Sequence, residues 1–138
     1  MNNKVLIGPS TFAALDSSPA DKLIDAGFEI VNNPFGRKLT VKELINLLPG
    51  INGIIAGLED LNRVVMEGSN LRVISRCGSG LSNVDLKAAE SLGIKVLSTP
   101  DGPTTSVAEL TVGLLLSMIR SLYKMNMSMH QRKWNKQI

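Results

Sequence analysis

The chain has 138 residues, of which 43% are hydrophobic and 20% are charged, and this composition excludes a disordered or collagen-like polypeptide. Its 15 Lys and Arg residues exceed its 12 Asp and Glu residues, but the surplus lies in the tail after Arg120 and forms no basic stripe, so we expect no nucleic-acid surface. The single cysteine, Cys77, excludes an internal disulfide and multi-cysteine zinc patterns, and it suits the cytoplasm, the compartment we expect.

Short β-branched runs alternate with helical segments along the first hundred residues. This alternation is typical of parallel strands joined by right-handed crossover helices. It predicts an α/β fold, namely a flavodoxin-like, doubly wound parallel sheet of about five strands. The expected strands are residues 4–7, 28–32, 53–56, 72–75 and 95–97.

Local capping signals mark the helices between these strands. Ser18, followed by a proline and an acidic residue, predicts one helix start, and Thr40 with Glu43 predicts a capping box at another. Asp85 is expected to cap a helix over 86–92. The predicted helix ends are Ala26-Gly27, Pro49-Gly50 and Leu92-Gly93.

The final segment departs from this rhythm. Ser106 and Glu109 have the spacing of a further capping box, and the helix that begins there is apolar nearly all round and is expected to continue past twenty residues. Such a helix needs a second surface, from another domain or another subunit. Charged residues interrupt its most apolar part, so we expect no membrane span. We therefore predict a flavodoxin-like domain over 1–104 and a long interdomain or dimerisation helix over 105–138.

Ligands of open α/β sheets bind past the carboxyl ends of the strands, so the residues that follow each strand are the candidates. After the fourth expected strand come Arg76, Cys77, Gly78, Ser79 and Gly80. The two glycines allow a sharp turn with consecutive exposed N–H groups, a concavity suited to a carboxylate or phosphate. A tight turn without a ligand is the alternative.

Signals of catalysis and of nucleotide binding are weak in this chain. Asn83 stands where the third glycine of a dinucleotide fingerprint starting at Gly78 would be, so we expect no standard phosphate cradle. His130 lies in a polar tail and is interpreted as a solvated side chain. Cys77 is interpreted as a packing residue, with a reactive thiol as the alternative. We assign no catalytic residue and no metal ligand.

Several of these motifs together resemble one family. The chain contains LRVISRCGSGLSNVDLKAAESLGIKVLSTPDGPTTSVAELTVGLLLSMIR, with an R-x-G-x-G loop, an NVD-helix-LGI-strand unit and an SVAELT helix in that order. It is similar to the N-terminal substrate-binding domain of D-isomer-specific 2-hydroxyacid dehydrogenases, most of all to their D-3-phosphoglycerate dehydrogenase branch. The segments NPFGRKLTVKEL and GIIAGLED resemble one subgroup of that branch.

The resemblance implies an oxidoreductase that uses NAD and acts on the CH–OH group of a small 2-hydroxy acid, or on the matching 2-oxo acid, with a role in serine biosynthesis. It places the substrate carboxylate on the N–H groups of Cys77 and Gly78. Arg76 and Arg37 are candidate substrate-binding cations because they lie near possible ligand loops, although each of them could equally be a solvated or helix-end charge. The resemblance sets Ser79 against the nicotinamide side of the cofactor.

The resemblance also implies a homodimer through the helix over 106–125. The family's catalytic arginine, glutamate and histidine and its nucleotide fingerprint are expected beyond Ile138, so we expect this truncated chain to be inactive and not to bind NAD tightly. Some phosphoglycerate dehydrogenases place a phosphate-binding arginine after the third strand, where this chain reads Gly57-Leu58-Glu59. Glu59 would repel a phosphate, although Arg37 could take the arginine's place.

A different class of function stays open on the sequence alone. The chain could be a standalone flavodoxin-like module that binds a small anion in the loop at Gly78, or an assembly element that dimerises through its long helix.

Overall fold

The computed structural model describes residues 3–134 of the chain. It divides into two compact units, Met1–Pro100 and Asp101–Ile138, which are described one at a time. The predicted boundary at 104/105 falls in the first turn of a helix of the second unit.

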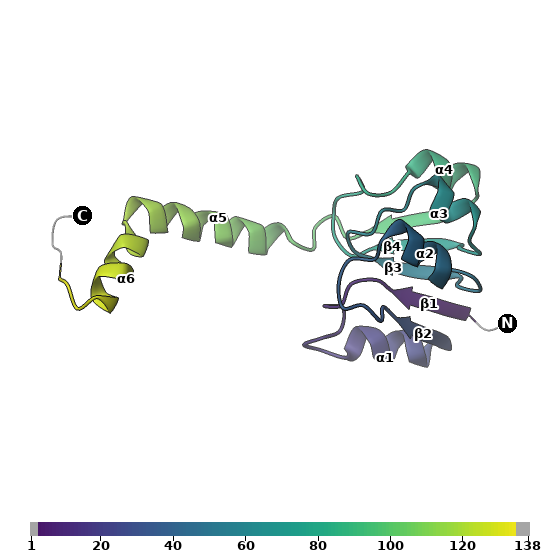
Figure 1. The fold of residues 1–138 in the computed structure, drawn as a ribbon, viewed down its shortest axis with the longest axis horizontal. Helices are drawn as coiled ribbons and strands as arrows, with labels where there is room; N and C mark the ends of the chain where they lie inside the picture. The colour runs from purple at the N-terminus through teal and green to yellow at the C-terminus, as the bar shows by residue number, and fades with distance from the viewer. Residues whose placement is uncertain (1–2, 135–138) are drawn as a thin grey trace. The chain divides into compact units, whose positions relative to one another are not determined.

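The first unit is built on a five-stranded sheet with the order β2-β1-β3-β4-β5, in which every neighbouring pair is parallel (Figure 1). The predicted doubly wound sheet is confirmed. β1 and β5 are each one residue longer than predicted, and β4 is shifted by one residue. The strands are β1 Asn3–Ile7, β2 Phe28–Asn32, β3 Gly53–Ala56, β4 Val73–Arg76 and β5 Lys95–Ser98.

Four helices connect these strands, and their ends test the predicted capping signals. Thr40 and Glu43 form the predicted capping box, and the Asp85 carboxylate accepts the N–H of Ala88 at 2.9 Å, so both predictions are confirmed. The prediction at Ser18 is wrong by one residue, because Ser18 bonds to Asp16 through both its N–H and its hydroxyl and Ser17 takes the cap position. The helices are α1 Ser18–Asp25, α2 Val41–Leu47, α3 Arg63–Glu67 and α4 Leu86–Ser91.

The predicted helix ends before β2, β3 and β5 are also confirmed. Gly27, Gly50 and Gly93 follow α1, α2 and α4 with φ of 82°, 78° and 68°, a backbone region that side-chain-bearing residues seldom adopt. Each helix therefore ends where the chain must turn back into the sheet.

One face of the sheet holds the core. The strand register aligns Leu6, Ile54, Ile74 and Val96 across four strands, and the first three are at most 1% exposed. They belong to one apolar cluster with residues of α2, α3 and α4. The connection from β1 to β2 runs opposite to the other three, so a right-handed crossover places α1 on the other face. Figure 1 shows α1 beside β2, away from α2, α3 and α4.

The second unit contains the helices α5, Thr104–Ile119, and α6, Leu122–His130. The prediction of one helix longer than twenty residues is wrong, because Ser121 has a left-handed φ of 50° that an α-helix cannot continue, and the two helices meet at a bend of 65°. The predicted capping box at Ser106 is wrong too. Pro103 begins the helix, with the Val107 N–H donating to the Pro103 carbonyl at 2.9 Å, and Ser106 lies within the first turn.

The helices of this unit were expected to form no membrane span, and their length and apolarity bear on that prediction. Among the described residues, no single helix has both the length and the apolarity of a span, and only α5 and α6 taken together across their bend reach them.

Candidate functional site

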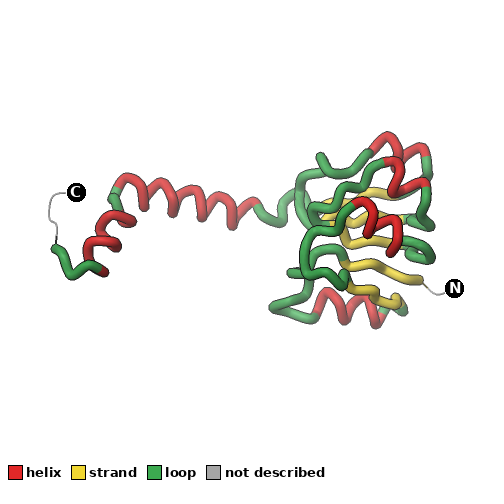
Figure 2. The backbone as a smooth tube through the Cα atoms, in the orientation of Figure 1, coloured by secondary structure: helices red, strands yellow, loops and turns green. Residues whose placement is uncertain are grey.

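Because all five strands run in one direction, the loops that follow them gather at one edge of the sheet, where Figure 2 shows them in green. A cavity of about 300 Å³ opens among the loops after β1, β2, β3 and β4, and we call it the carboxyl-end cavity. This is the position where the sequence analysis placed the ligand. The cavity is lined by Gly8, Pro9, Ser10, Thr11, Arg37, Lys38, Gly57, Leu58, Glu59, Arg76 and Cys77.

Three of the predicted site residues, Arg37, Arg76 and Cys77, thus line one cavity. Gly78 and Ser79 continue the loop that follows β4, beyond the residues that line the cavity. Sequence reasoning missed Ser10 and Thr11, although they follow a strand just as the chosen residues do.

The glycine-rich loop uses some of its N–H groups internally. The Cys77 N–H donates to the Ala56 carbonyl at 2.8 Å, and the Gly78 N–H donates to the Thr99 hydroxyl and to the Arg76 carbonyl, both at 3.0 Å. No hydrogen bond within residues 3–134 uses the N–H groups of Ser79 or Gly80. The donors that point to no internal acceptor are therefore those of the next two residues.

Gly78 itself is required by the geometry of this loop. Its φ of 138° is rarely adopted by other residues, and a Cβ at this position would lie 2.6 Å from Nη1 of Arg76. The Arg76 side chain therefore packs directly against the backbone of the loop.

Asn83 links the loops that follow β3 and β4. Its Nδ2 donates to the carbonyl of Glu59 at 2.6 Å and to that of Gly57 at 3.2 Å, and its Oδ1 accepts from Nε of Arg76 at 3.4 Å. Arg76 Nη1 also donates to the Cys77 carbonyl. Sequence reasoning noted Asn83 only as a departure from a glycine pattern, because its partners lie far away in sequence.

Glu59 is the one charged side chain that is buried in the described part of the chain, with 2% exposure. Its Oε2 accepts the N–H of Gly57, and its carboxylate lies so close to Gly8 that a Cβ there would be 2.8 Å from Cδ. The sequence predicted a negative charge at this edge, and the structure places it inside the cavity wall.

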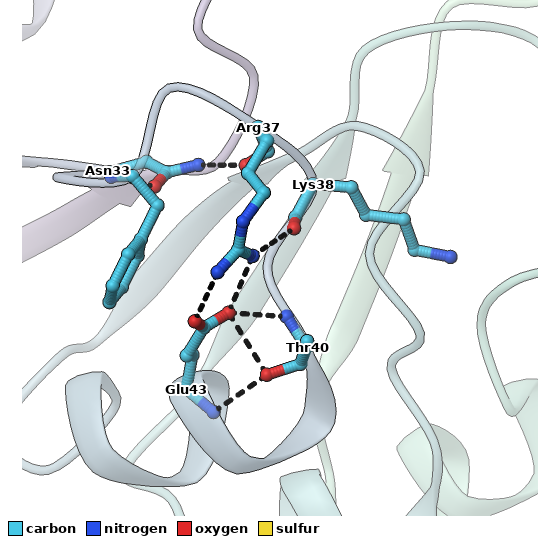
Figure 3. A network of polar contacts seen from close by, with 6 residues as sticks. Asn33, Arg37, Lys38, Thr40 and Glu43 are labelled. Carbon is cyan, nitrogen blue, oxygen red and sulfur yellow. Dashed lines mark hydrogen bonds and ion pairs between the residues drawn. The ribbon is translucent and has the colours of Figure 1, made fainter.

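Arg37 lies at the cavity but is paired with a carboxylate (Figure 3). Its Nη2 donates to Glu43 Oε1 at 2.7 Å and its Nη1 to Glu43 Oε2 at 3.0 Å, while Glu43 Oε2 also accepts the Thr40 N–H at 2.8 Å. The guanidinium of Arg37, together with the Thr40 N–H, lowers the pKa of Glu43 to about 2. In turn, Glu43 raises the pKa of Arg37. The charge of Arg37 is therefore largely balanced by the Glu43 carboxylate, which belongs to the capping box of α2.

The remaining candidates lie outside this cavity. His130, at the end of α6, is exposed as predicted, and its Nδ1 is 3.0 Å from the Asn126 carbonyl oxygen. Within the described residues, no group of three or more His, Cys, Asp or Glu side chains is arranged to hold a metal ion.

Comparison with known proteins identifies relatives of this fold and site. The family described as "D-isomer specific 2-hydroxyacid dehydrogenase, catalytic domain" matches residues 11–133. D-3-phosphoglycerate dehydrogenase of Sus scrofa is 36% identical over 135 residues, covering 96% of this chain and 24% of that protein. Hydroxypyruvate reductase of Thermotoga maritima is 35% identical over 96 residues, covering 68% of this chain and 31% of that protein.

Solved structures with a similar fold include further dehydrogenase-like matches to this chain. A protein of Thermus thermophilus matches with a TM-score of 0.84 and 29% identity, over 98% of this chain and 42% of that one. The NAD+-bound 3-phosphoglycerate dehydrogenase of Entamoeba histolytica has the same fold, with a TM-score of 0.74 and 22% identity over 85% of this chain and 39% of that one. The chain spans about a quarter of the first curated relative's length.

Proposed function

Because the chain belongs to the D-isomer specific 2-hydroxyacid dehydrogenase family, we propose that it is the substrate-binding part of an NAD-dependent dehydrogenase of the phosphoglycerate dehydrogenase type. The substrate class is a small 2-hydroxy acid or the matching 2-oxo acid. The observation that carries this proposal is the carboxyl-end cavity, which has Arg76 in its wall and a glycine-rich loop with unused N–H donors beside it.

The substrate carboxylate binds at the loop from Arg76 to Gly80. A guanidinium and backbone N–H groups are donors only, and charge-assisted hydrogen bonds to a carboxylate are the stronger kind. The predicted donors of Cys77 and Gly78 serve internal acceptors, so binding there requires the loop to exchange those bonds. The N–H groups of Ser79 and Gly80 need no such exchange, and we assign them the first contact.

We propose that the described residues do not by themselves bind the dinucleotide. Asn83 occupies the position of the third glycine in the fingerprint that begins at Gly78. Its amide hydrogens are donated to the carbonyls of Gly57 and Glu59 in the preceding loop. Ser79 is exposed, and it is our candidate for contact with the nicotinamide side of NAD. We derive no hydride step from this chain, and we propose that it shows no turnover alone.

Titration of the ¹⁵N-labelled chain with D-glycerate tests the binding proposal. We expect shifts at the amides of Ser79 and Gly80, and we expect Arg76→Gln to weaken binding by about tenfold, because a hydrogen bond to a charged group is worth roughly 1.5–3 kcal/mol. Arg72→Gln is the matched control, since it removes the same charge from an exposed residue outside the cavity. Equal affinities of the two variants would contradict the assignment.

The proposed inactivity has its own test. The chain is mixed with NAD and D-3-phosphoglycerate and the formation of NADH is followed by absorbance. Steady NADH production by the pure 138-residue chain would show that the proposal is wrong.

A homodimer through residues 106–125, which span most of α5 and the start of α6, is a second proposal, favoured by the surface of α5. None of the residues of α5 is buried within the second unit, and its large apolar residues are between 53% and 79% exposed. Covering such a helix with a second copy removes this apolar surface from water. A role in serine biosynthesis and a cytoplasmic location stay predictions.

A further inference from the structure

We infer that Glu59 sets the specificity of the carboxyl-end cavity: it selects a 2-hydroxy acid with a hydroxyl group on its third carbon and disfavours a phosphate at that position. The inference rests on the proposed function, because it assumes that the cavity holds a 2-hydroxy acid.

The position of the Glu59 carboxylate is built into the loops after β1 and β3. Neither Gly8 nor Gly57 has a positive φ, so the backbone does not require glycine there. What both glycines provide is space, since a Cβ at Gly8 would meet Cδ of Glu59 at 2.8 Å and a Cβ at Gly57 would meet Oε2 at 3.2 Å. The Gly57 N–H and the Asn83 amide then fix the side chain and the backbone of Glu59.

The cations around the cavity do not neutralise this carboxylate. The ion pairs of the described residues join other side chains, and Glu59 takes part in none of them. Arg37 is paired with Glu43, and Lys38 is exposed, so solvent screens its charge. Arg76 lies at the end of β4, where the substrate carboxylate is assigned.

The cavity wall therefore offers two chemically different groups. Arg76, at the end of β4, offers donors, whereas Glu59, beside Gly8 and Gly57, offers oxygens, which as a carboxylate accept hydrogen bonds and donate none. A hydroxyl group on the substrate can donate to Glu59. A phosphate dianion has no proton to donate, and its charge is repelled most strongly where burial lowers the local dielectric. A methyl group has no hydrogen-bond donor to offer the carboxylate in place of water.

Three ligands that differ only at the third carbon test this inference. D-Glycerate carries a hydroxyl there, D-lactate has hydrogen only, and D-3-phosphoglycerate carries a phosphate. In amide-shift titrations of the wild-type chain, we expect D-glycerate to bind most tightly and D-3-phosphoglycerate least tightly. In Glu59→Gln, whose amide can donate, we expect the affinity for D-3-phosphoglycerate to rise by about tenfold and that for D-glycerate to fall.

Asp60→Asn is the matched control. It makes the same change of charge one residue away, at an exposed side chain outside the cavity, and should leave the ranking unchanged. If Asp60→Asn raises the affinity for D-3-phosphoglycerate as much as Glu59→Gln does, net charge explains the effect and the inference is overturned.

The wild-type ranking decides the question even if Glu59→Gln fails to fold. Tightest binding of D-3-phosphoglycerate by the wild-type chain, or equal binding of all three ligands, would refute the role of Glu59 and leave the proposed substrate site intact. Binding of none of the three would refute the proposed function, and this inference with it.

Discussion

Replacement of Asn83 by alanine is expected to destabilise the first unit by about 2 kcal/mol. The amide group of Asn83 donates to the carbonyls of Glu59 and Gly57 and accepts from Arg76. Each such bond contributes a net of about 1 kcal/mol, and the contact with Arg76, at 3.4 Å, is the weakest of the three. The two carbonyls left without a donor account for most of the expected loss.

Urea denaturation followed by far-UV circular dichroism measures this loss. Fluorescence is unsuitable, because the single tryptophan and the single tyrosine, Trp134 and Tyr123, both belong to the second unit. With a slope of about 2 kcal/mol/M, the expected midpoint falls by about 1 M urea. Ser82→Ala, at an exposed residue of the same loop, should leave the midpoint unchanged.

Asn83→Asp tests the two hydrogen bonds that the Asn83 amide donates separately from the one that it accepts. It keeps an oxygen for Arg76 but places a carboxylate against the carbonyls of Glu59 and Gly57, so it should destabilise the unit at least as much as alanine does. A loss below about 0.5 kcal/mol in both Asn83 variants would refute the view that this side chain holds the two loops together.

Four further predictions concern other parts of the chain. Thr40→Val removes the hydroxyl that accepts the Glu43 N–H and should cost about 1 kcal/mol in urea denaturation. Since the pKa of Glu43 is lowered from 4.5 to about 2, its stabilising effect is present above pH 4.5 and is lost as the pH falls towards 2. The stability difference between the wild-type chain and Glu43→Gln, measured from about pH 7 down to about pH 2, should therefore shrink on acidification; a constant difference would contradict this. Leu6→Ala removes a fully buried side chain and should cost about 2–5 kcal/mol. Leu115→Glu, on exposed α5, should convert the proposed dimer to a monomer in analytical ultracentrifugation, whereas a wild-type chain that is already monomeric would refute the dimer.

Much of the fold follows from signals that act within a few residues. The alternation of β-branched runs with helical segments predicted the five strands. The caps at Thr40 and Asp85 were predicted because the capping oxygen and the N–H that donates to it lie three residues apart. The wrong cap at Ser18 also has a local cause, since the Asp16 carboxylate, two residues away, accepts both the hydroxyl and the N–H of Ser18. The break at Ser121 carried no such signal, because serine has no strong preference that marks a bend.

The sheet, the direction of its strands and the edge at which ligand residues meet could be predicted from the sequence, since crossover connections have one hand and parallel strands end together. The contacts that those residues make there became visible only in the folded chain. Glu59 is buried because Gly8 and Gly57 leave room for it, Arg37 is paired with Glu43, and Asn83 joins two loops by bonds to residues 24 and 26 positions away along the chain. Burial and pairing arise from contacts distant in sequence, and no local pattern records them.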